Sequence, residues 1–323
     1  DWSVPSWSKS PKNGKPEKSI SAWKPSNRLN KTPFYRKWVA QSGSTAVPGL
    51  AAKPIVDMLV EVTSLEEVKQ RVVPILESKG YDYFWRPTWG DDVPPWYAWF
   101  IRRNADGVRT HHIHMVEGHF EYWDRLLFRD YLIKHRSVAI EYQLLKMQLA
   151  TAYPSDRVAY TKGKTAFITR HHIQALVDLE TEGWNTKHSD FFLSIIHPDM
   201  VWPWPPTNDA FDPIDWVFVL GRFHREQWKK AWQDLFDTHD LIHNHRTTVK
   251  IELSKELDAA FAVVDIDTLW RHIKTGGESH WKGRVCKIYT KLATGHWKFY
   301  FQTGALDYLK IGRNAEIPLK EQQ

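Results

Sequence analysis

The chain has 323 residues, of which 42% are hydrophobic and 25% are charged. These proportions exclude a disordered or fibrous chain, and the length predicts about two domains. The net charge of +6 is confined to residues 1–40, which hold nine Lys or Arg against two acidic residues, while the other 283 residues hold 35 basic and 36 acidic ones. The body of the protein therefore gives no basic signal for specific nucleic-acid binding.

Three other features of the composition narrow the class. No uncharged apolar run approaches the roughly 20 residues of a membrane-spanning helix, so we expect no membrane partner. The single cysteine, Cys286, cannot form an internal disulfide, and the chain lacks a signal-peptide pattern, so we predict a cytoplasmic protein. Aromatic residues make up 14% of the chain, which suits large cores or an aromatic-lined ligand cavity.

The first part of the chain predicts a basic leader and then a sheet followed by helices. Residues 1–40 are rich in Ser, Pro and Lys and show no sustained periodicity. Hydrophobic patterns and capping signals then predict strands at 54–62, near 81, at 96–103 and at 110–117, with helices at 64–78, 123–134, 138–150 and 157–179. On the first strand Asp57, Leu59 and Glu61 share one face, and the opposite face is apolar.

A glycine-serine turn lies shortly before the strand that carries Asp57. Gly43, Ser44, Thr45 and Lys53 precede this carboxylate. Such an arrangement suits a phosphate held by backbone N–H groups and a metal ion held by the aspartate. The alternative is a structural turn beside an aspartate whose hydrogen bonds are all made within the protein.

Two histidines on the strand at 110–117 are candidate metal ligands. His112 and His114 lie on one face of that strand. Two imidazoles at i and i+2 can chelate one metal ion, with Asp57 as the third ligand if the two strands are neighbours. The alternative is a pair of hydrogen-bonded histidines that line a polar cleft without a metal ion.

Three basic residues on the predicted helices are candidate phosphate contacts. Arg129, Lys146 and Lys164 lie downstream of the histidine strand. They either reach the phosphates of a bound ligand or form an ordinary solvated face.

Four segments of the chain, taken in order, resemble successive motifs of the GrpB family. They are GSTAVPGLAAKPIVD at 43–57, HHIH at 111–114, FRDYL at 128–132 and YTKGK at 160–164, and the resemblance covers roughly residues 38–171. It implies a nucleotidyltransferase-like fold in which the Gly-Ser turn and strand carboxylates hold a divalent metal ion, Mg²⁺ or Mn²⁺, and a nucleoside triphosphate. The family's activity is itself poorly defined, so the resemblance implies no particular reaction.

The chain departs from that pattern at two places. Gln41-Ser42 stands where the family has a His-Ile pair. Nucleotidyltransferases place two carboxylates two residues apart on one strand, but Leu59 occupies the second position, which leaves Asp57 and Glu61 as the candidate catalytic carboxylates.

Residues beyond 172 predict helices followed by a long, curved antiparallel sheet. The predicted elements are helices at 189–196 and 222–236, an extended segment at 199–204, and strands at 247–253, 257–269, 281–292 and 297–302. Residues 172–308 resemble the SnoaL-like and ketosteroid-isomerase-like superfamily through FFLSIIHPDMVW at 191–202, the helix at 221–236, DID at 265–267, HWKGR at 280–284 and the segment at 297–306. The resemblance implies a sheet wrapped on helices around a conical cavity. Members include isomerases, dehydratases, cyclases, epoxide hydrolases and non-catalytic dimerisation modules.

The predicted cone contains two candidate catalytic carboxylates, Asp265 and Asp267, on one face of a strand. Beside aromatic walls they would have raised pKa values and act as acid or base. The alternative is that they are ion-paired carboxylates on the outer face of the sheet. The candidate pocket residues are Trp202, Phe261, His280, Trp281 and Tyr289.

Taken together, the sequence predicts an α+β protein with four parts: a leader at 1–40, a GrpB-like nucleotidyltransferase-fold domain at 41–171, a SnoaL-like cone domain at 172–310 and a tail at 311–323. The leading functional prediction is a small-molecule metabolic enzyme whose first domain binds a nucleotide or phosphorylated ligand with a divalent metal ion. The cone would bind an apolar or aromatic substrate or form a homodimer. The alternatives are acid-base catalysis wholly within the cone, or a non-catalytic binding protein.

Overall fold

The computed structural model describes residues 8–9, 39–87, 94–118, 120–203 and 213–306. It divides into two compact units, one of residues 1–172 with 294–296 and one of residues 173–293 with 297–323. The predicted tail and most of the predicted leader lie outside the described residues. Among the helices that the structure describes, none is both long enough and apolar enough to cross a membrane.

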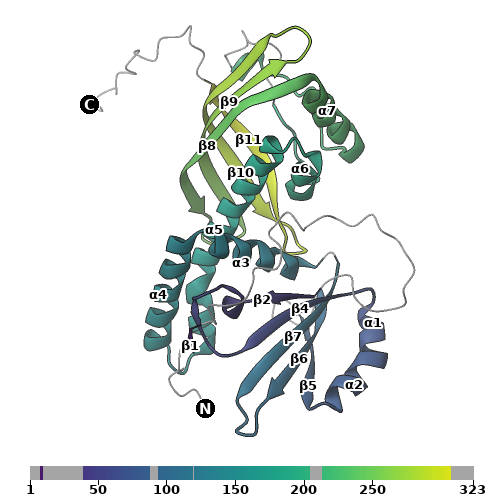
Figure 1. Cartoon of the computed structure of the whole chain (residues 1–323), viewed down its shortest axis with the longest axis vertical. Helices are drawn as coiled ribbons and strands as arrows, with labels where there is room; N and C mark the ends of the chain where they lie inside the picture. Colours follow the sequence, from purple (N-terminus) through teal and green to yellow (C-terminus); the bar gives the residue numbers. More distant parts are fainter. Residues whose placement is uncertain (1–7, 10–38, 88–93, 119, 204–212, 307–323) are drawn as a thin grey trace. The chain divides into compact units, whose positions relative to one another are not determined.

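A five-stranded mixed sheet forms the centre of the first unit, in the order β2-β4-β7-β6-β5 (Figure 1). Its strands are β2 (Val39–Ser42), β4 (Val56–Val62), β5 (Tyr81–Pro87), β6 (Trp96–Arg103) and β7 (Arg109–Glu117). A short pair of strands, β1 (Ser8–Lys9) and β3 (Ala51–Ala52), lies outside this sheet. Strands β4 and β7 are parallel neighbours, and their register sets Asp57 directly opposite His112.

Helical segments of the first unit occur where capping and periodicity predict them. A single helical stretch consists of α1 (Leu65–Glu67), a π-helical turn (Val68–Val72) and α2 (Val73–Glu77). It begins at the predicted capping box, where the Ser64 hydroxyl accepts a hydrogen bond from the Glu67 N–H. The later helices are α3 (Asp124–Lys134), α4 (Arg136–Ala152) and α5 (Arg157–Asn185), and α5 continues into the second unit.

The two faces of the first sheet have separate hydrophobic cores. The helical stretch from α1 to α2 packs through Val68 and Val73 on one face, against Ile113 and Met115 of β7. The opposite face carries Leu59, Trp99, Ile101 and Val116, which pack with Phe120, Tyr122 and Leu126. Because side chains alternate along a strand, Asp57, His112 and His114 belong to this second face.

The second unit is a curved four-stranded antiparallel sheet in the order β11-β10-β9-β8, with helices packed on one face. The strands are β8 (His239–Leu253), β9 (Ala259–His272), β10 (Glu278–Lys291) and β11 (Trp297–Leu306). The helices are the C-terminal part of α5, α6 (Ser189–Ile195) and α7 (Arg225–Thr238). Register shifts between β8 and β9 and between β10 and β11 are irregularities that bend a sheet. The α+β class and the cone architecture predicted from the sequence are confirmed.

Some element boundaries differ from the prediction. Strand β8 begins at His239 rather than at 247. Helix α7 begins after His224, whose imidazole accepts a hydrogen bond from the Gln227 N–H. The segment predicted as extended at 199–204 contributes only a single bridge from Val201 to Arg222 within the part that the structure describes.

The helix-covered face of the second sheet is a dense aromatic core. Trp184, Trp228 and Trp270 are at most 1% exposed, and Trp232 and Phe236 are 3% exposed. On β9 the buried positions are Ala260, Ala262, Val264, Thr268 and Trp270. The residues that alternate with them, including Phe261, Asp265 and Asp267, therefore lie on the outer face.

Candidate functional site

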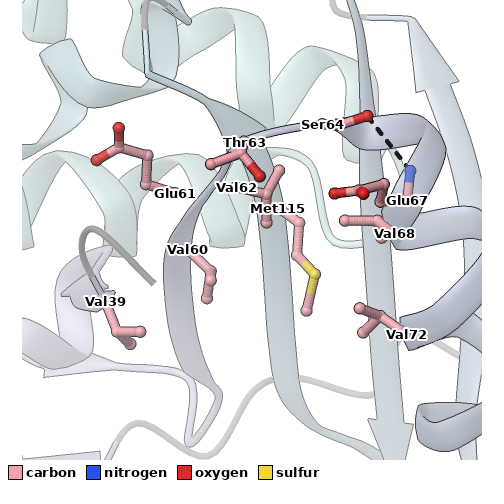
Figure 2. Close-up of a pocket in the computed structure, with 10 residues that line it drawn as sticks. All are labelled: Val39, Val60, Glu61, Val62, Thr63, Ser64, Glu67, Val68, Val72 and Met115. Atoms are coloured by element: carbon pink, nitrogen blue, oxygen red, sulfur yellow. Dashed lines mark hydrogen bonds between the residues drawn. The ribbon is translucent and has the colours of Figure 1, made fainter. Parts of the chain in front are cut away.

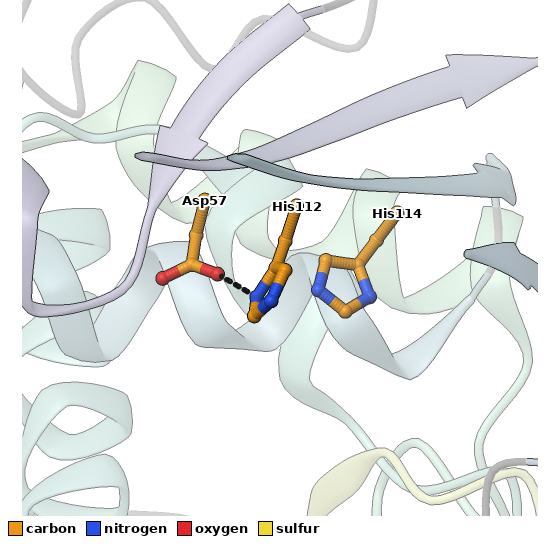
Figure 3. A group of neighbouring side chains, drawn as sticks. All are labelled: Asp57, His112 and His114. Atoms are coloured by element: carbon orange, nitrogen blue, oxygen red, sulfur yellow. Dashed lines mark hydrogen bonds and ion pairs between the residues drawn. The ribbon is translucent and has the colours of Figure 1, made fainter. Parts of the chain in front are cut away.

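One carboxylate and two imidazoles meet where β4 and β7 run side by side. The Asp57 carboxylate (Oδ1) lies 2.9 Å from the His112 imidazole (Nδ1), and His114 is the next side chain on the same face (Figure 3). One ligand atom from each of the three residues lies within 4.8 Å of the others. Strands β4 and β7 are therefore neighbours, as a metal site shared by Asp57, His112 and His114 requires.

Two imidazole nitrogens of this cluster are buried without a hydrogen-bond partner. Among the described residues, the His112 Nε2 and the His114 Nδ1 have none, and neither does the indole nitrogen of Trp99. The Trp99 ring stacks on His114 with centroids 5.8 Å apart and meets the edge of His112 at 5.3 Å. Buried polar atoms in native proteins are nearly always paired with protein, water or an ion. Unpartnered nitrogens that gather beside a carboxylate thus indicate a place for a ligand.

His114 is a neutral imidazole at physiological pH. Burial lowers its pKa well below the ordinary value of 6.5, and the positive charge of Arg125 and the neighbouring His112 lower that pKa further. A neutral imidazole has a free lone pair, the form in which histidine binds metal ions.

The Gly-Ser turn packs directly against Asp57. A Cβ atom at Gly43 would stand 2.6 Å from the Asp57 carboxylate (Oδ2), and Gly43 has a positive φ of 73°, a backbone conformation that favours glycine. The hydroxyls of this turn make contacts within the protein: Thr45 donates to the Ile55 carbonyl at 2.9 Å, and Ser44 accepts from the Lys146 ammonium at 3.0 Å. This turn therefore fixes the position of the carboxylate.

Five cationic side chains lie near the cluster or near one another, and we call them the cationic group: Lys53, Arg109, Arg125, Arg157 and Lys164. Burial lowers the pKa of Lys164 to about 8, helped by the charges of Lys53, Arg157 and Arg125 and opposed by Asp57. Burial, Arg157 and Arg109 likewise lower the pKa of Lys53. Mutual effects of this kind indicate that these charges lie near one another.

The Tyr160 ring connects two members of the cationic group. The Lys164 ammonium lies 4.5 Å from the centroid of this ring, and the Lys53 ammonium lies 5.8 Å from it. Within the described part of the chain Lys164 makes no hydrogen bond or ion pair. Its charge is consequently available to an anionic ligand.

The other two predicted phosphate contacts have structural partners. Lys146 is 3% exposed and donates to the Ser44 hydroxyl and the Ala51 carbonyl, which ties α4 to the Gly-Ser turn. Arg129 donates to the Gln41 carbonyl at 2.7 Å and to the Asp130 carboxylate. Arg129 therefore holds β2, and its contact with a phosphate stays a prediction.

Glu61 does not join Asp57, contrary to its prediction as a second catalytic carboxylate. Four residues along a strand separate side chains by about 13 Å, and Glu61 lies against Gly118, where a Cβ would be 2.7 Å from the Glu61 carboxylate. It lines a hollow of about 120 Å³ between the end of β4 and the α1 segment (Figure 2). Half of the ten lining residues are valine, and the volume is below the roughly 300–1,000 Å³ of ordinary small-molecule sites.

The candidate catalytic carboxylates of the cone lie on its outer face. Asp265 forms a two-point ion pair with Arg284, at 2.7 and 2.9 Å. Asp267 accepts hydrogen bonds from His243 and His280. The assignment of both as catalysts inside a cavity is wrong, because their strand turns Val264 and Thr268 inward. Both are ion-paired carboxylates on the outer face of the sheet, which is the alternative that the sequence also allowed.

The predicted cone pocket is divided between the two faces. Phe261, 37% exposed, and His280 lie on the outer face with Asp267. Trp202 and Tyr289 are buried in the interior, where Trp281 also contacts Trp184. Only the last three could contact a molecule bound inside the cone.

The interior of the cone also contains a buried ion triad of Glu180, Arg246 and Lys287, which was not predicted from the sequence. The Glu180 carboxylate binds the Lys287 ammonium at 2.8 Å and the Arg246 guanidinium at 2.7 Å. All three side chains are at most 6% exposed. Burial alone would raise the pKa of Glu180, but the two cations and their hydrogen bonds outweigh burial and lower this pKa to about 2.

Sequence reasoning also missed parts of the first site, namely Trp99, Arg109, Arg125 and Arg157. A signal existed for one of them, because Arg157, Tyr160 and Lys164 follow the i, i+3, i+7 spacing of a single helical face. Arg125 and Arg109 reach the site only through the tertiary fold.

Comparison with known proteins identifies the family of the first unit. The family model described as GrpB protein matches residues 21–173. The glutamate-rich protein GrpB of Alkalihalophilus pseudofirmus is 38% identical over 134 residues, which are 41% of this chain and 75% of that protein. This chain belongs to the GrpB family. The match begins upstream of the segment at 38–171 that carries the resemblance in the sequence analysis.

Other similar proteins match only part of this chain. The UPF0157 protein YqkA of Bacillus subtilis is 41% identical over 127 residues, so this chain spans about a third (35%) of that relative's length. The solved structure of the conserved protein GrpB from Enterococcus faecalis is 35% identical, covers 44% of this chain and 81% of its own, and has a TM-score of 0.38. Solved neighbours also include a ketosteroid isomerase-like protein from Erwinia carotovora at 15% identity, covering 40% of this chain and 89% of its own with a TM-score of 0.32. The cone architecture itself is evident from the strand order and helix packing of the second unit.

Proposed function

We propose that the first unit binds a phosphorylated small molecule, most simply a nucleotide, together with a divalent metal ion held by Asp57, His112 and His114. The observation that carries the proposal is the pair of unpartnered imidazole nitrogens beside Asp57. The cationic group around them supports an anionic ligand. The bound ion would act as a Lewis acid on a phosphoryl oxygen.

Electrostatics support joint binding of metal and phosphate. Among the described residues, the carboxylates of Asp57 and Asp82 act on the five cations of the group, on Lys164 and Arg109 respectively. A bare divalent ion therefore meets net repulsion, while a triphosphate brings enough negative charge to reverse it. The affinity for the metal ion should therefore rise in the presence of the phosphorylated ligand, and linkage requires the reverse effect to be equal.

The ligand atoms of the three residues indicate which metal ion the site would hold. Imidazole nitrogens suit transition metals, whereas Mg²⁺ prefers oxygen ligands and retains its waters. With two histidines and one aspartate, we propose Mn²⁺ or a similar transition ion ahead of Mg²⁺. The resemblance implied either ion.

We further propose that the whole protein is a small-molecule metabolic enzyme in which the cone binds an apolar partner substrate or pairs with a second copy. Trp202, Trp281 and Tyr289 give this interior the aromatic surface that such a substrate would contact. Acid-base catalysis by Asp265 and Asp267 within the cone is not proposed, because both lie on the outer face.

A thermal-shift series tests the proposal. Wild-type protein, Asp57→Asn and the control Asp82→Asn are heated with nucleoside triphosphates in the presence of Mn²⁺, Mg²⁺ or chelator. Asp82 is a suitable control because its carboxylate pairs with Arg103 and contacts neither histidine of the cluster, so that it affects the site only through the charge of Arg109. A ligand at 100 times its Kd stabilises by about 2.7 kcal/mol, which is a shift of several degrees.

We expect a shift that needs metal ion and nucleotide together, is larger with Mn²⁺, disappears in Asp57→Asn and persists in Asp82→Asn. Equal shifts in wild type and Asp57→Asn would contradict the proposal. So would the absence of a shift with every nucleotide.

A further inference from the structure

We propose a second metal site, for a borderline-soft divalent ion such as Zn²⁺, on the outer face of the cone sheet at His243, Asp267 and His280. These residues come from three adjacent strands, β8, β9 and β10. One ligand atom from each lies within 4.8 Å of the others. The site shares no residue with the Asp57 cluster, so it stands independently of the proposed function.

The strand register explains why these side chains converge. His243 and His280 both pair with Leu269, one from each neighbouring strand, and Asp267 lies two residues before Leu269 on the same face. The Asp267 carboxylate (Oδ1) is 2.7 Å from the His243 Nε2 and 2.8 Å from the His280 Nε2. Three long paired strands hold this geometry, so few side-chain rotations are needed to admit an ion.

The distances fit a zinc ion. Tetrahedral Zn²⁺ with bonds of about 2.0–2.1 Å keeps its ligand atoms about 3.3 Å apart, slightly more than the present separations from Asp267. The two histidine rings meet nearly at right angles, with centroids 5.7 Å apart. When the ion binds, each imidazole presents its Nε2 lone pair and keeps its proton on Nδ1.

The second oxygen of the carboxylate already has a partner. The Lys282 ammonium lies 2.9 Å from the Asp267 Oδ2, so Oδ1 would bind the ion and Oδ2 would remain hydrogen-bonded. Metal-binding carboxylates commonly have such support.

Access and chemistry together indicate the class of ion. The side chains of His243 and Asp267 are 29% exposed and that of His280 is 37% exposed, so an ion can enter from solvent and retain a water ligand. Two imidazoles and one carboxylate suit Zn²⁺, Co²⁺ or Ni²⁺ and disfavour Mg²⁺.

Zinc titration of the full chain by isothermal calorimetry tests the site. The protein set is wild type, Asp267→Asn, His280→Gln, His243→Gln, the control Asp265→Asn and Asp57→Asn. Asp265 is on the same strand and face but is paired with Arg284. We expect one Zn²⁺ equivalent to be lost or weakened at least about tenfold in each of the first three variants, and to persist in Asp265→Asn and Asp57→Asn. Mg²⁺ should not compete.

Cobalt absorption gives an independent readout on the Asp57→Asn background. We expect a visible Co²⁺ spectrum typical of nitrogen and oxygen ligands, which His280→Gln abolishes without changing the unfolding midpoint of the metal-free protein. Unchanged Zn²⁺ stoichiometry in all three ligand variants would overturn the proposal. A Co²⁺ spectrum that survives the loss of His280 would overturn it as well.

Discussion

Replacing Glu180 by Gln is expected to lower the free energy of unfolding of the cone unit by about 3–5 kcal/mol. The change leaves Lys287 and Arg246 buried without their shared carboxylate. Loss of a charge partner in the interior exposes the full desolvation cost of the remaining cations. Chemical denaturation followed by tryptophan fluorescence measures the effect, because Trp184 and Trp270 lie in the same core.

The matched control is Asp265→Asn, which removes a carboxylate from a solvent-exposed pair on the same sheet. Exposed pairs contribute about 0–1 kcal/mol, so this variant should unfold almost as wild type does. A loss of less than 1 kcal/mol in Glu180→Gln would show that the triad does not stabilise the cone in the way described.

The same triad predicts how the cone responds to acid. Because the folded-state pKa of Glu180 is about 2, below its ordinary value of 4.5, its contribution to stability is complete above about pH 4.5. This contribution is lost as the pH falls toward 2. Glu180→Gln should remove this part of the acid dependence.

Replacing Lys164 by Met is expected to weaken binding of the phosphorylated ligand about 10- to 100-fold, the usual effect of losing one charged hydrogen bond. The same change should raise the unfolding midpoint of the ligand-free protein near neutral pH. Burial and neighbouring cations lower the pKa of Lys164 from 10.5 to about 8, so the protonated lysine destabilises the fold. Calorimetric binding and thermal unfolding measure the two effects, and Lys162→Met, exposed on the same helix, is the control.

The pH dependence of binding should follow the same group. Below about pH 8 Lys164 is charged and attracts the ligand, and as the pH rises through 8 the charge and the affinity decline. The stability of the ligand-free protein changes with pH in the opposite direction. Between pH 8 and 10.5 the unfolded chain binds more protons than the folded chain, so stability rises with pH. Lys164→Arg should keep its charge and flatten the binding profile. A Lys164→Met variant that binds as tightly as wild type would contradict this role.

Local signals were sufficient for much of the fold. The alternation around Asp57, the capping box at Ser64 and the apolar spacing of the long helices all predict elements that the structure contains. The sequence does not indicate the start of β8, because its inward-facing positions carry the polar residues Asn244 and Arg246. This part of the strand therefore shows no apolar face in the sequence pattern. Thr268 donates a hydrogen bond to Asn244, and Arg246 donates one to Glu180, which offsets the cost of burying these polar groups. Such long-range pairing leaves no pattern in the local sequence.

The candidate site could likewise be predicted only in part from the sequence. The histidine pair and Asp57 follow from strand alternation, but their meeting depends on β4 and β7 being neighbours, which is a property of the sheet order. Asp265 and Asp267 show the limit of face analysis, since alternation groups residues on a face without saying which face is covered by helices.

The most direct test of the central claim is a crystal of the full chain grown with Mn²⁺ and a nucleoside triphosphate, with anomalous scattering recorded at the manganese edge. The account predicts a manganese peak bonded to Asp57, His112 and His114, with a phosphate oxygen on the ion and another beside Lys164. Nucleotide density elsewhere on the chain, with no manganese at this cluster, would contradict it.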